Sequence, residues 1–196
     1  MSRFDERTAL VVVDVQNDFA DPSGSLAVAG GEAIVPRVND AIAQAVEAGA
    51  LVVATQDWHP EVTPHFAKDG GVWPVHCVRG TWGAELHPAL ALPTDVPRVR
   101  KGTNGEDGYS GFTVRDPRTG EETATELEAR LREREIERVV VCGLATDYCV
   151  KATALDGARL GFEVEILADG IAAVDLSPDD GERALAEMAD AGVRTG

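Results

Sequence analysis

Short apolar runs alternate along the chain with longer segments of helical periodicity. Runs rich in Val, Ile and Leu, bounded by polar or turn-forming residues, predict strands at 8–13, 51–55, 97–100, 139–142, 162–168 and 192–194. Apolar residues at helical spacing predict helices at 35–48, 123–134, 147–160 and 177–189. This alternation predicts an α/β fold of three α/β/α layers, with a mostly parallel, Rossmann-like sheet of about six strands.

Residues at the ends of the predicted helices support these boundaries. Gly49 and Gly161 each follow a helix in the position of a C-cap. Pro178 stands at the first position of the helix that Ser177 begins, where its missing N–H costs nothing.

Two long stretches, 58–93 and 101–122, lack a regular pattern. Loops of this length in a compact domain are usually functional or disordered. They hold most of the His and Trp residues, so we expect function there. The chain has no repeat, low-complexity tract or linker, which predicts one domain over residues 1–196.

The chain is acidic, with a formal net charge of −16. This charge argues against nucleic acid and anionic membranes as partners. No apolar run is long enough to cross a membrane, and the charged start has no signal-peptide pattern. The three cysteines, an odd number, favour reduced thiols and a cytoplasmic location. The oligomeric state stays open, and a homo-oligomer is compatible with the sequence.

Reactive side chains follow four of the predicted strands. Asp14, Asp57 and Lys101 come after the first three strands, and a turn leading to Cys149 follows the fourth. Ligands of open α/β sheets bind outside the carboxyl ends of the strands. We therefore expect these groups to meet at one edge of the sheet.

The segment 139–150 carries the clearest chemical signal. An apolar strand ends at Gly143, and Thr146 or Asp147 is predicted to cap the helix that follows by accepting a backbone N–H. Cys149 then lies in the first turn, where free N–H groups and the helix dipole favour a thiolate. A thiolate here predicts covalent catalysis. Cys142 lies in the buried strand and is expected to be inert.

Asp14, Lys101 and Cys149 together form a catalytic set. The carboxylate can accept the thiol proton, and the ammonium can hold that carboxylate ionised. The backbone N–H groups of Ala145 and Cys149 are candidates for an oxyanion hole. The competing interpretations are an Asp that only shapes the strand end and a Lys that is only a solvated surface residue.

Asp57, His59, His65 and His76 are candidate ligands of one divalent metal ion. Asp57 and His59 are separated by one residue, so in extended chain both side chains point to the same face. Carboxylate and imidazole suit Zn, Mn and Fe alike, and the ligand types do not choose among them. The alternative is a set of loop histidines that hydrogen-bond the backbone.

Other residues of the loops have simpler roles. Phe19 and Trp73 are the expected aromatic walls of a flat pocket, although core packing is the default for Phe19. Cys77, next to His76, is expected to point away from the metal site. His87 lies outside the cluster and is expected to be structural.

Six short motifs occur in an order typical of one family. In these motifs the chain resembles the nicotinamidases, also called pyrazinamidases, within the isochorismatase-like cysteine hydrolases. The motifs are DVQNDF at 14–19, DWHP at 57–60, WPVHCV at 73–78, KG at 101–102, YSGF at 109–112 and GLATDYCV at 143–150.

The resemblance implies the isochorismatase-like hydrolase fold and assigns roles to individual residues. It implies an Asp14–Lys101–Cys149 triad and a cis peptide between Leu144 and Ala145 that aims the Ala145 N–H into the oxyanion hole. The implied metal ligands are Asp57, His59, His65 and His76. The implied substrate-binding residues are Phe19, Trp73, Leu144 and Tyr148.

The implied activity is hydrolysis of nicotinamide, and of pyrazinamide, through a Cys thioester in NAD salvage. The partner is then a small aromatic amide. A second hypothesis is another amidase of the same family, acting on a ureido or carbamoyl compound without a ring-orienting metal. A third is a non-catalytic binder of small molecules that kept the fold. The metal ligands favour the first, because the related amidases generally lack them.

Overall fold

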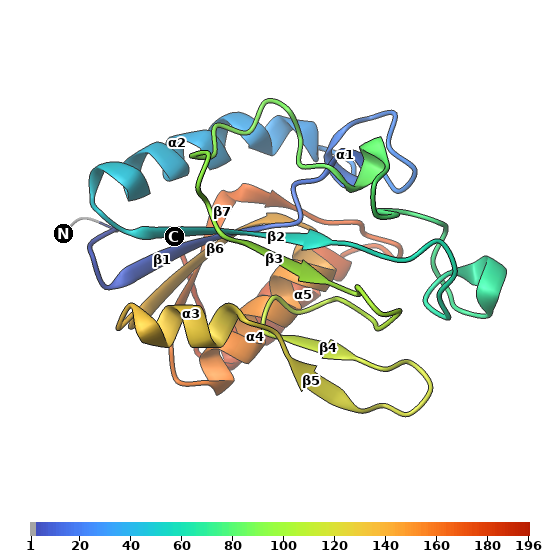
Figure 1. Cartoon of the computed structure of the whole chain (residues 1–196). Helices are drawn as coiled ribbons and strands as arrows, with labels where there is room; N and C mark the ends of the chain where they lie inside the picture. The colour runs from blue at the N-terminus through green and yellow to red at the C-terminus, as the bar shows by residue number, and fades with distance from the viewer. Residues whose placement is uncertain (1–2) are drawn as a thin grey trace.

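The computed structural model describes residues 3–196 of the chain. Six strands, all parallel, form one sheet in the order β3-β2-β1-β6-β7-β8 (Figure 1). The strands are β1 Thr8–Val13, β2 Leu51–Asp57, β3 Arg98–Lys101, β6 Arg138–Leu144, β7 Glu163–Ala172 and β8 Arg194–Thr195. The predicted parallel sheet of about six strands is confirmed.

Helices cover both faces of the sheet and complete the three layers (Figure 1). One face lies under α2, and the other packs on α3, α4 and α5. The four helices are α2 Val35–Glu47, α3 Leu127–Glu133, α4 Lys151–Arg159 and α5 Asp180–Asp190. Among the residues described, no helix has both the length and the apolar character needed to cross a membrane.

The central strand β1 shows why its sequence is an unbroken apolar run. Leu10 and Val12 belong to the core on the α2 side, whereas Val11 and Val13 belong to the core on the other side. Every residue of β1 is buried. A strand covered on both faces has no side chains that face solvent. The alternation of apolar and polar residues seen in half-exposed strands is therefore missing.

Short elements lie mainly in the connections, where the sequence shows no periodicity. They are α1 Asn17–Ala20, the 3₁₀ turns η1 Glu32–Ile34, η2 Ala67–Asp69 and η3 Trp82–Ala84, the single π-helical turn η4 Thr146–Val150, and the strands β4 Thr113–Arg115 and β5 Glu122–Ala124. The sequence did not predict them, because they are too short to show a repeat.

The predicted helix at 123–134 was wrong in its first part. Residues Glu122–Ala124 form β5, which pairs antiparallel with β4. The helix begins only at Leu127, whose N–H is accepted by the Thr125 hydroxyl. β5 is exposed and β4 is only partly buried, so the hairpin lacks the apolar face that would distinguish it from a charged helix.

The predicted start of the last helix at Ser177 was also wrong. Asp179 has a φ of 67°, a left-handed conformation that no helix continues through, and α5 begins at Asp180. The carboxylates of Asp175 and Asp180 accept the N–H groups of Gly181 and Ser177. The N–H groups of this turn are thus bonded by aspartates and not by a helix beginning at Ser177.

The strand order reverses between β1 and β6. From β1 the chain continues outward to β2 and β3, and on the other side of β1 lie β6, β7 and β8. The crevice at the carboxyl ends of β1 and β6 is therefore the topological switch point, where ligands bind in such sheets.

Leu131 tests the core between α3 and the sheet. Its side chain is fully buried, whereas Leu176 is 67% exposed, so the two give a matched pair of Leu→Ala changes. We expect Leu131→Ala to lower the free energy of unfolding by ~2–5 kcal/mol. Leu176→Ala should stay within about 0.5 kcal/mol of the wild type. Urea denaturation measures both, and equal losses would contradict this packing.

Candidate active site

Four reactive side chains meet at the carboxyl edge of the sheet, as predicted. Asp14 directly follows β1, Asp57 ends β2, Lys101 ends β3, and Cys149 lies in η4 after β6. One oxygen each of Asp14 and Asp57 and the Cys149 sulfur lie within 4.8 Å of one another. The carboxyl ends of neighbouring strands bring these groups together.

Lys101 is the centre of this group. Its Nζ lies 2.7 Å from Asp14 Oδ2 and 2.7 Å from Asp57 Oδ1, and it also donates to the carbonyl of Gly108. The Cys149 sulfur is 3.8 Å away. Burial alone would lower the pKa of Lys101, but the two carboxylates outweigh it and hold this pKa well above its usual value. Lys101 is therefore a permanent, buried cation.

Asp14 is placed to act as a base. Its Oδ1 accepts the Thr55 hydroxyl at 2.6 Å, and its backbone N–H donates to the same oxygen of Thr55. Complete burial raises the pKa of Asp14, although Lys101 opposes the shift. A raised pKa makes this carboxylate a better proton acceptor than an ordinary aspartate.

Asp57 differs from Asp14, although both contact Lys101. Burial pushes its pKa upward, but the Lys101 ammonium and the nearby His59 ring hold the pKa well below the usual value. Gln16 fixes the backbone of Asp57, because its side-chain amide donates to the Asp57 carbonyl and accepts the Asp57 N–H. Asp57 is thus a rigid, ionised carboxylate.

Cys149 is buried, with 7% of its surface exposed. Burial raises the pKa of its thiol well above the ordinary value, although Lys101 opposes the shift. The raised pKa favours the thiol, in contrast to the resting thiolate that the sequence predicted. Loss of water costs a thiolate more than the helix start returns, so the proton must leave during the reaction. The inert behaviour expected of Cys142 agrees with its burial, which raises its pKa to about 12.

The predicted capping of the nucleophile helix was wrong as well. Ala145 precedes η4 and no side chain caps it. The Asp147 carboxylate instead accepts the backbone N–H groups of Val174 and Asp175, each at 2.9 Å. Asp147 therefore ties the nucleophile turn to the segment after β7. The peptide between Leu144 and Ala145 is cis, as the resemblance implied.

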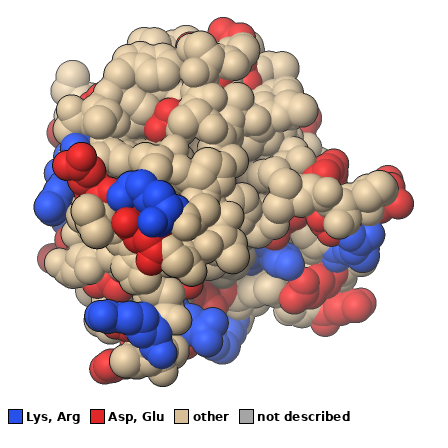
Figure 2. Space-filling model, turned by 90° about the vertical axis from the view of Figure 1, so that its right-hand side faces the viewer, with Lys and Arg blue, Asp and Glu red and all other residues tan. Residues whose placement is uncertain are grey.

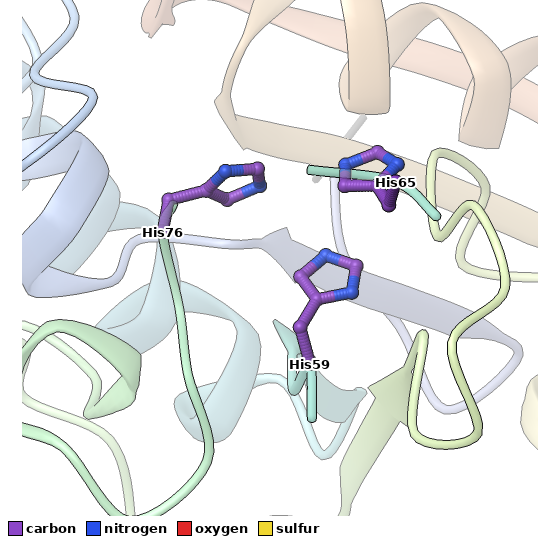
Figure 3. Close-up of side chains that lie close together, drawn as sticks. All are labelled: His59, His65 and His76. Atoms are coloured by element: carbon purple, nitrogen blue, oxygen red, sulfur yellow. The ribbon is translucent and has the colours of Figure 1, made fainter. Parts of the chain in front are cut away.

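His59, His65 and His76 converge beside this group (Figure 3). Each offers a ring nitrogen, and these three nitrogens lie within 4.8 Å of one another. Asp57 Oδ2 lies 3.6 Å from His59 Nε2 and 3.8 Å from His76 Nε2. The carboxylate of Asp57 therefore lies between the Lys101 ammonium and the histidines.

The chemistry of this cluster fits a divalent metal ion. Both ring nitrogens of His59 are buried without a hydrogen-bond partner among the described residues, which is costly unless a ligand pairs them. His65 Nδ1 and His76 Nδ1 face Asp107 Oδ1 and the Pro74 carbonyl. Both partners are acceptors, so each Nδ1 carries the proton and each Nε2 keeps a free lone pair.

Glycine makes room for this cluster. A Cβ on Gly102, whose φ is +69°, would lie 2.5 Å from the ring of His59. A Cβ on Gly108 would lie 2.9 Å from Asp57 Oδ1 and from Lys101 Cβ. The chain passes these two positions too closely for any other residue.

A pocket with aromatic walls opens directly over the thiol. Every predicted substrate-binding residue lines it, as do Ala145 and Cys149, whereas Asp14 and Lys101 lie behind them. The lining residues include Phe19, Trp73, Leu144, Tyr148, Asp57, His65, His76 and Tyr109. Trp73 is buried: its ring packs edge-on against Tyr148 with centroids 4.9 Å apart, and its Nε1 donates to the Tyr109 hydroxyl.

The face that contains the carboxyl edge is largely free of charged side chains at its centre, with Lys, Arg, Asp and Glu around the periphery (Figure 2).

The two remaining loop residues, Cys77 and His87, behave as expected. Cys77 is buried with its sulfur near the Gly83 carbonyl, and the ring of His87 accepts the N–H of Ala89.

Sequence reasoning missed several residues that hold the site in place. Thr55 and Gln16 support Asp14 and Asp57, and Asp107 and Tyr109 support His65 and Trp73. Thr55 and Gln16 did carry a signal, since a polar residue inside a buried apolar strand or turn needs a partner. Asp107 carried none, because an Asp in a polar loop is ordinary.

Comparison with known proteins agrees with this geometry. A family model described as the isochorismatase domain matches residues 8–195. The chain belongs to the isochorismatase family.

Relatives within this family are nicotinamidases and pyrazinamidases. The nicotinamidase/pyrazinamidase of Mycobacterium tuberculosis is 42% identical, over 94% of this chain and 96% of its own. The pyrazinamidase of Pyrococcus horikoshii in complex with zinc is 44% identical, with a TM-score of 0.86 over 97% of this chain and 98% of that one. An L. infantum protein in complex with nicotinate is 39% identical, with a TM-score of 0.87 over 98% of this chain and 94% of that one.

Replacing Lys101 should destabilise this isochorismatase-family fold. Lys101→Met leaves two buried carboxylates without their cation, so we expect a loss of ~3–5 kcal/mol in the free energy of unfolding. Lys151→Met is the matched control, because Lys151 pairs with Glu187 at the surface and should contribute at most about 1 kcal/mol. Urea denaturation measures both.

The loss in Lys101→Met should depend on pH. The folded-state pKa of Asp14 is already raised, and it rises further without the ammonium. A raised carboxylate pKa means that the penalty is small when the group is protonated and grows as pH rises through that pKa. The loss should be larger at neutral than at mildly acidic pH, and a pH-independent loss would argue against buried charge as its cause.

Proposed function

We propose that this protein is a nicotinamidase: it hydrolyses nicotinamide to nicotinate and ammonia, and pyrazinamide likewise, in NAD salvage. The observation that carries the proposal is the position of Cys149. Its thiol lies beside the Asp14–Lys101 pair at the base of an aromatic-walled pocket, next to a three-histidine cluster. The similarity to nicotinamidases and pyrazinamidases over nearly the whole chain supports it.

Acylation begins with the thiol proton. Asp14, whose pKa is raised, accepts this proton as the sulfur attacks the carboxamide carbon. Lys101 stabilises negative charge on the Asp14 carboxylate and on the Cys149 sulfur. The N–H groups of Ala145 and Cys149 bind the oxygen of the tetrahedral intermediate. The C–N bond then breaks, and Asp14 returns the proton to the departing ammonia, which leaves a thioester on Cys149.

Deacylation reuses the same base. Asp14 takes a proton from a water molecule, which attacks the thioester carbon. The carbon–sulfur bond breaks, the sulfur recovers a proton from Asp14, and nicotinic acid leaves and loses its proton to water as nicotinate. The buried carboxylate is thus needed in both halves of the reaction, as a base and as an acid.

The walls of the pocket suit an aromatic amide. Phe19 and Trp73 offer apolar ring surfaces, and Leu144 and Tyr148 complete the wall beside the nucleophile. Asp57, His59, His65 and His76 would hold one divalent ion of Zn, Mn or Fe, which would supply a Lewis-acidic position for the ring nitrogen.

We also propose a cytoplasmic location for the protein, because its three cysteines are free thiols.

The nucleophile is tested by Cys149→Ala. Without the sulfur no thioester forms, so ammonia release from nicotinamide should fall by at least ~10⁴-fold. Cys142→Ala changes a buried thiol outside the site and should keep the wild-type rate. A Cys149→Ala variant that retains activity would refute the covalent mechanism. A wild-type protein that releases ammonia from a ureido or carbamoyl amide but not from nicotinamide would refute the substrate.

The metal is tested by chelation. Removing bound metal should sharply reduce ammonia release from nicotinamide, because the ring would lose the position that orients it. Adding Zn, Mn or Fe back should restore the activity, and the best of the three identifies the ion. Activity that survives removal, checked by elemental analysis of the stripped protein, would mean that the histidines are structural.

A further inference from the structure

Asp107 approaches the histidine cluster from outside the motifs that predict the site. It lies in the loop between β3 and β4, and its N–H and carbonyl form a two-way bridge with Arg115 at 2.7 and 3.0 Å. The next two residues are also fixed, because the Gly108 carbonyl accepts from Lys101 and the Tyr109 hydroxyl accepts from Trp73. Hydrogen bonds of Asp107 itself and of the two residues after it therefore hold this part of the loop in place.

The Asp107 carboxylate contacts the rear of His65. Its Oδ1 lies 2.6 Å from His65 Nδ1, and the two side chains are 18% and 3% exposed. Short, partly buried hydrogen bonds of this kind are stronger than neutral ones. His65 Nε2 is left facing His59 and His76 (Figure 3).

The segment that carries His65 needs such support. His65 lies in an irregular loop, where no strand or helix sets the direction of its ring. The same segment is docked on the 102–107 loop by a second contact, since the Thr63 hydroxyl donates to the Gly105 carbonyl at 3.0 Å. Two hydrogen bonds from neighbouring residues thus join the histidine loop to the loop after β3.

The three histidines differ in what lies behind them. His76 Nδ1 faces a neutral carbonyl, that of Pro74, and neither nitrogen of His59 has a hydrogen-bond partner among the described residues. Within residues 3–196, Asp107 is the only residue that places a carboxylate within hydrogen-bond distance behind one of these rings. A carboxylate behind a ligating histidine fixes its tautomer and raises the basicity of the other nitrogen.

We propose that Asp107 is a positioning residue of the metal site, which orients His65 and strengthens its Nε2 as a ligand. This proposal rests on the metal binding included in the proposed function. Asp107 is not among the residues that line the pocket, so its effect on the reaction passes through His65 and the ion.

The test measures zinc affinity on metal-stripped protein by competition with a chromophoric chelator. Asp107→Ala should weaken zinc binding by ~10–100-fold. Glu106→Ala is the matched control: it removes a neighbouring carboxylate that accepts hydrogen bonds from Asn104 and not from a histidine of the cluster among the described residues, and it should leave the affinity unchanged. Asp107→Asn keeps an acceptor oxygen without its charge, and its affinity should fall between those of the wild type and Asp107→Ala.

A double-mutant cycle separates positioning from general damage. If Asp107 acts through His65, the variant with both Asp107→Ala and His65→Ala should bind zinc as His65→Ala alone does. Additive losses, or an Asp107→Ala affinity equal to that of Glu106→Ala, would overturn the proposal. If Asp107→Ala does not fold, as judged by circular dichroism, the comparison of Asp107→Asn with Glu106→Gln decides in the same way.

These outcomes are independent of the proposed reaction. A wild-type protein that binds zinc but does not release ammonia from nicotinamide would refute the proposed function and leave the role of Asp107 standing. If the wild type releases ammonia from nicotinamide as expected but Asp107→Ala binds zinc as tightly as the wild type, only the role of Asp107 is refuted.

Discussion

The buried ammonium of Lys101 is the charge on which the rest of the site depends. Two buried carboxylates, Asp14 and Asp57, share it. One cation cannot neutralise two anions, so the group keeps a net negative charge, and Asp57 directs its second oxygen toward the histidines. The protein relieves this charge unevenly: Asp57 stays ionised, while Asp14 becomes readier to take a proton. A single ion pair thus divides two identical side chains into a ligand and a base.

Sheet pairing sets the distances in this group. Asp57 and Lys101 are register partners in the β2–β3 pair, and Val13, just before Asp14, is paired with Gly143 of β6. The spacing of parallel strands therefore determines how far apart the reactive groups lie. Side chains on strand ends are held more firmly than side chains on loops, which suits a reaction that moves a proton between neighbouring atoms.

The fold and the reactive residues could largely be predicted, because they depend on strong local signals. Unbroken apolar runs such as 8–13 and 139–142 mark strands buried on both faces. Asp14 directly follows the first run, and the turn that leads to Cys149 follows the second. The errors arose where distant contacts decide. Asp147 bonds to Val174 instead of capping its own helix, and burial overrides the helix start at Cys149. The roles of Asp107 and of the exposed hairpin follow only from how two loops pack together.

One feature of the connectivity bears on how such a protein changes over evolutionary time. The four candidate ligands and Asp107 all fall in the single stretch 57–107, whereas Asp14 and Cys149 lie on either side of it. Substitutions or recombination within that stretch can rebuild the metal centre as a unit without touching the nucleophile or its base. Lys101 lies inside the stretch and serves both groups, so it is the one residue that every such exchange has to keep.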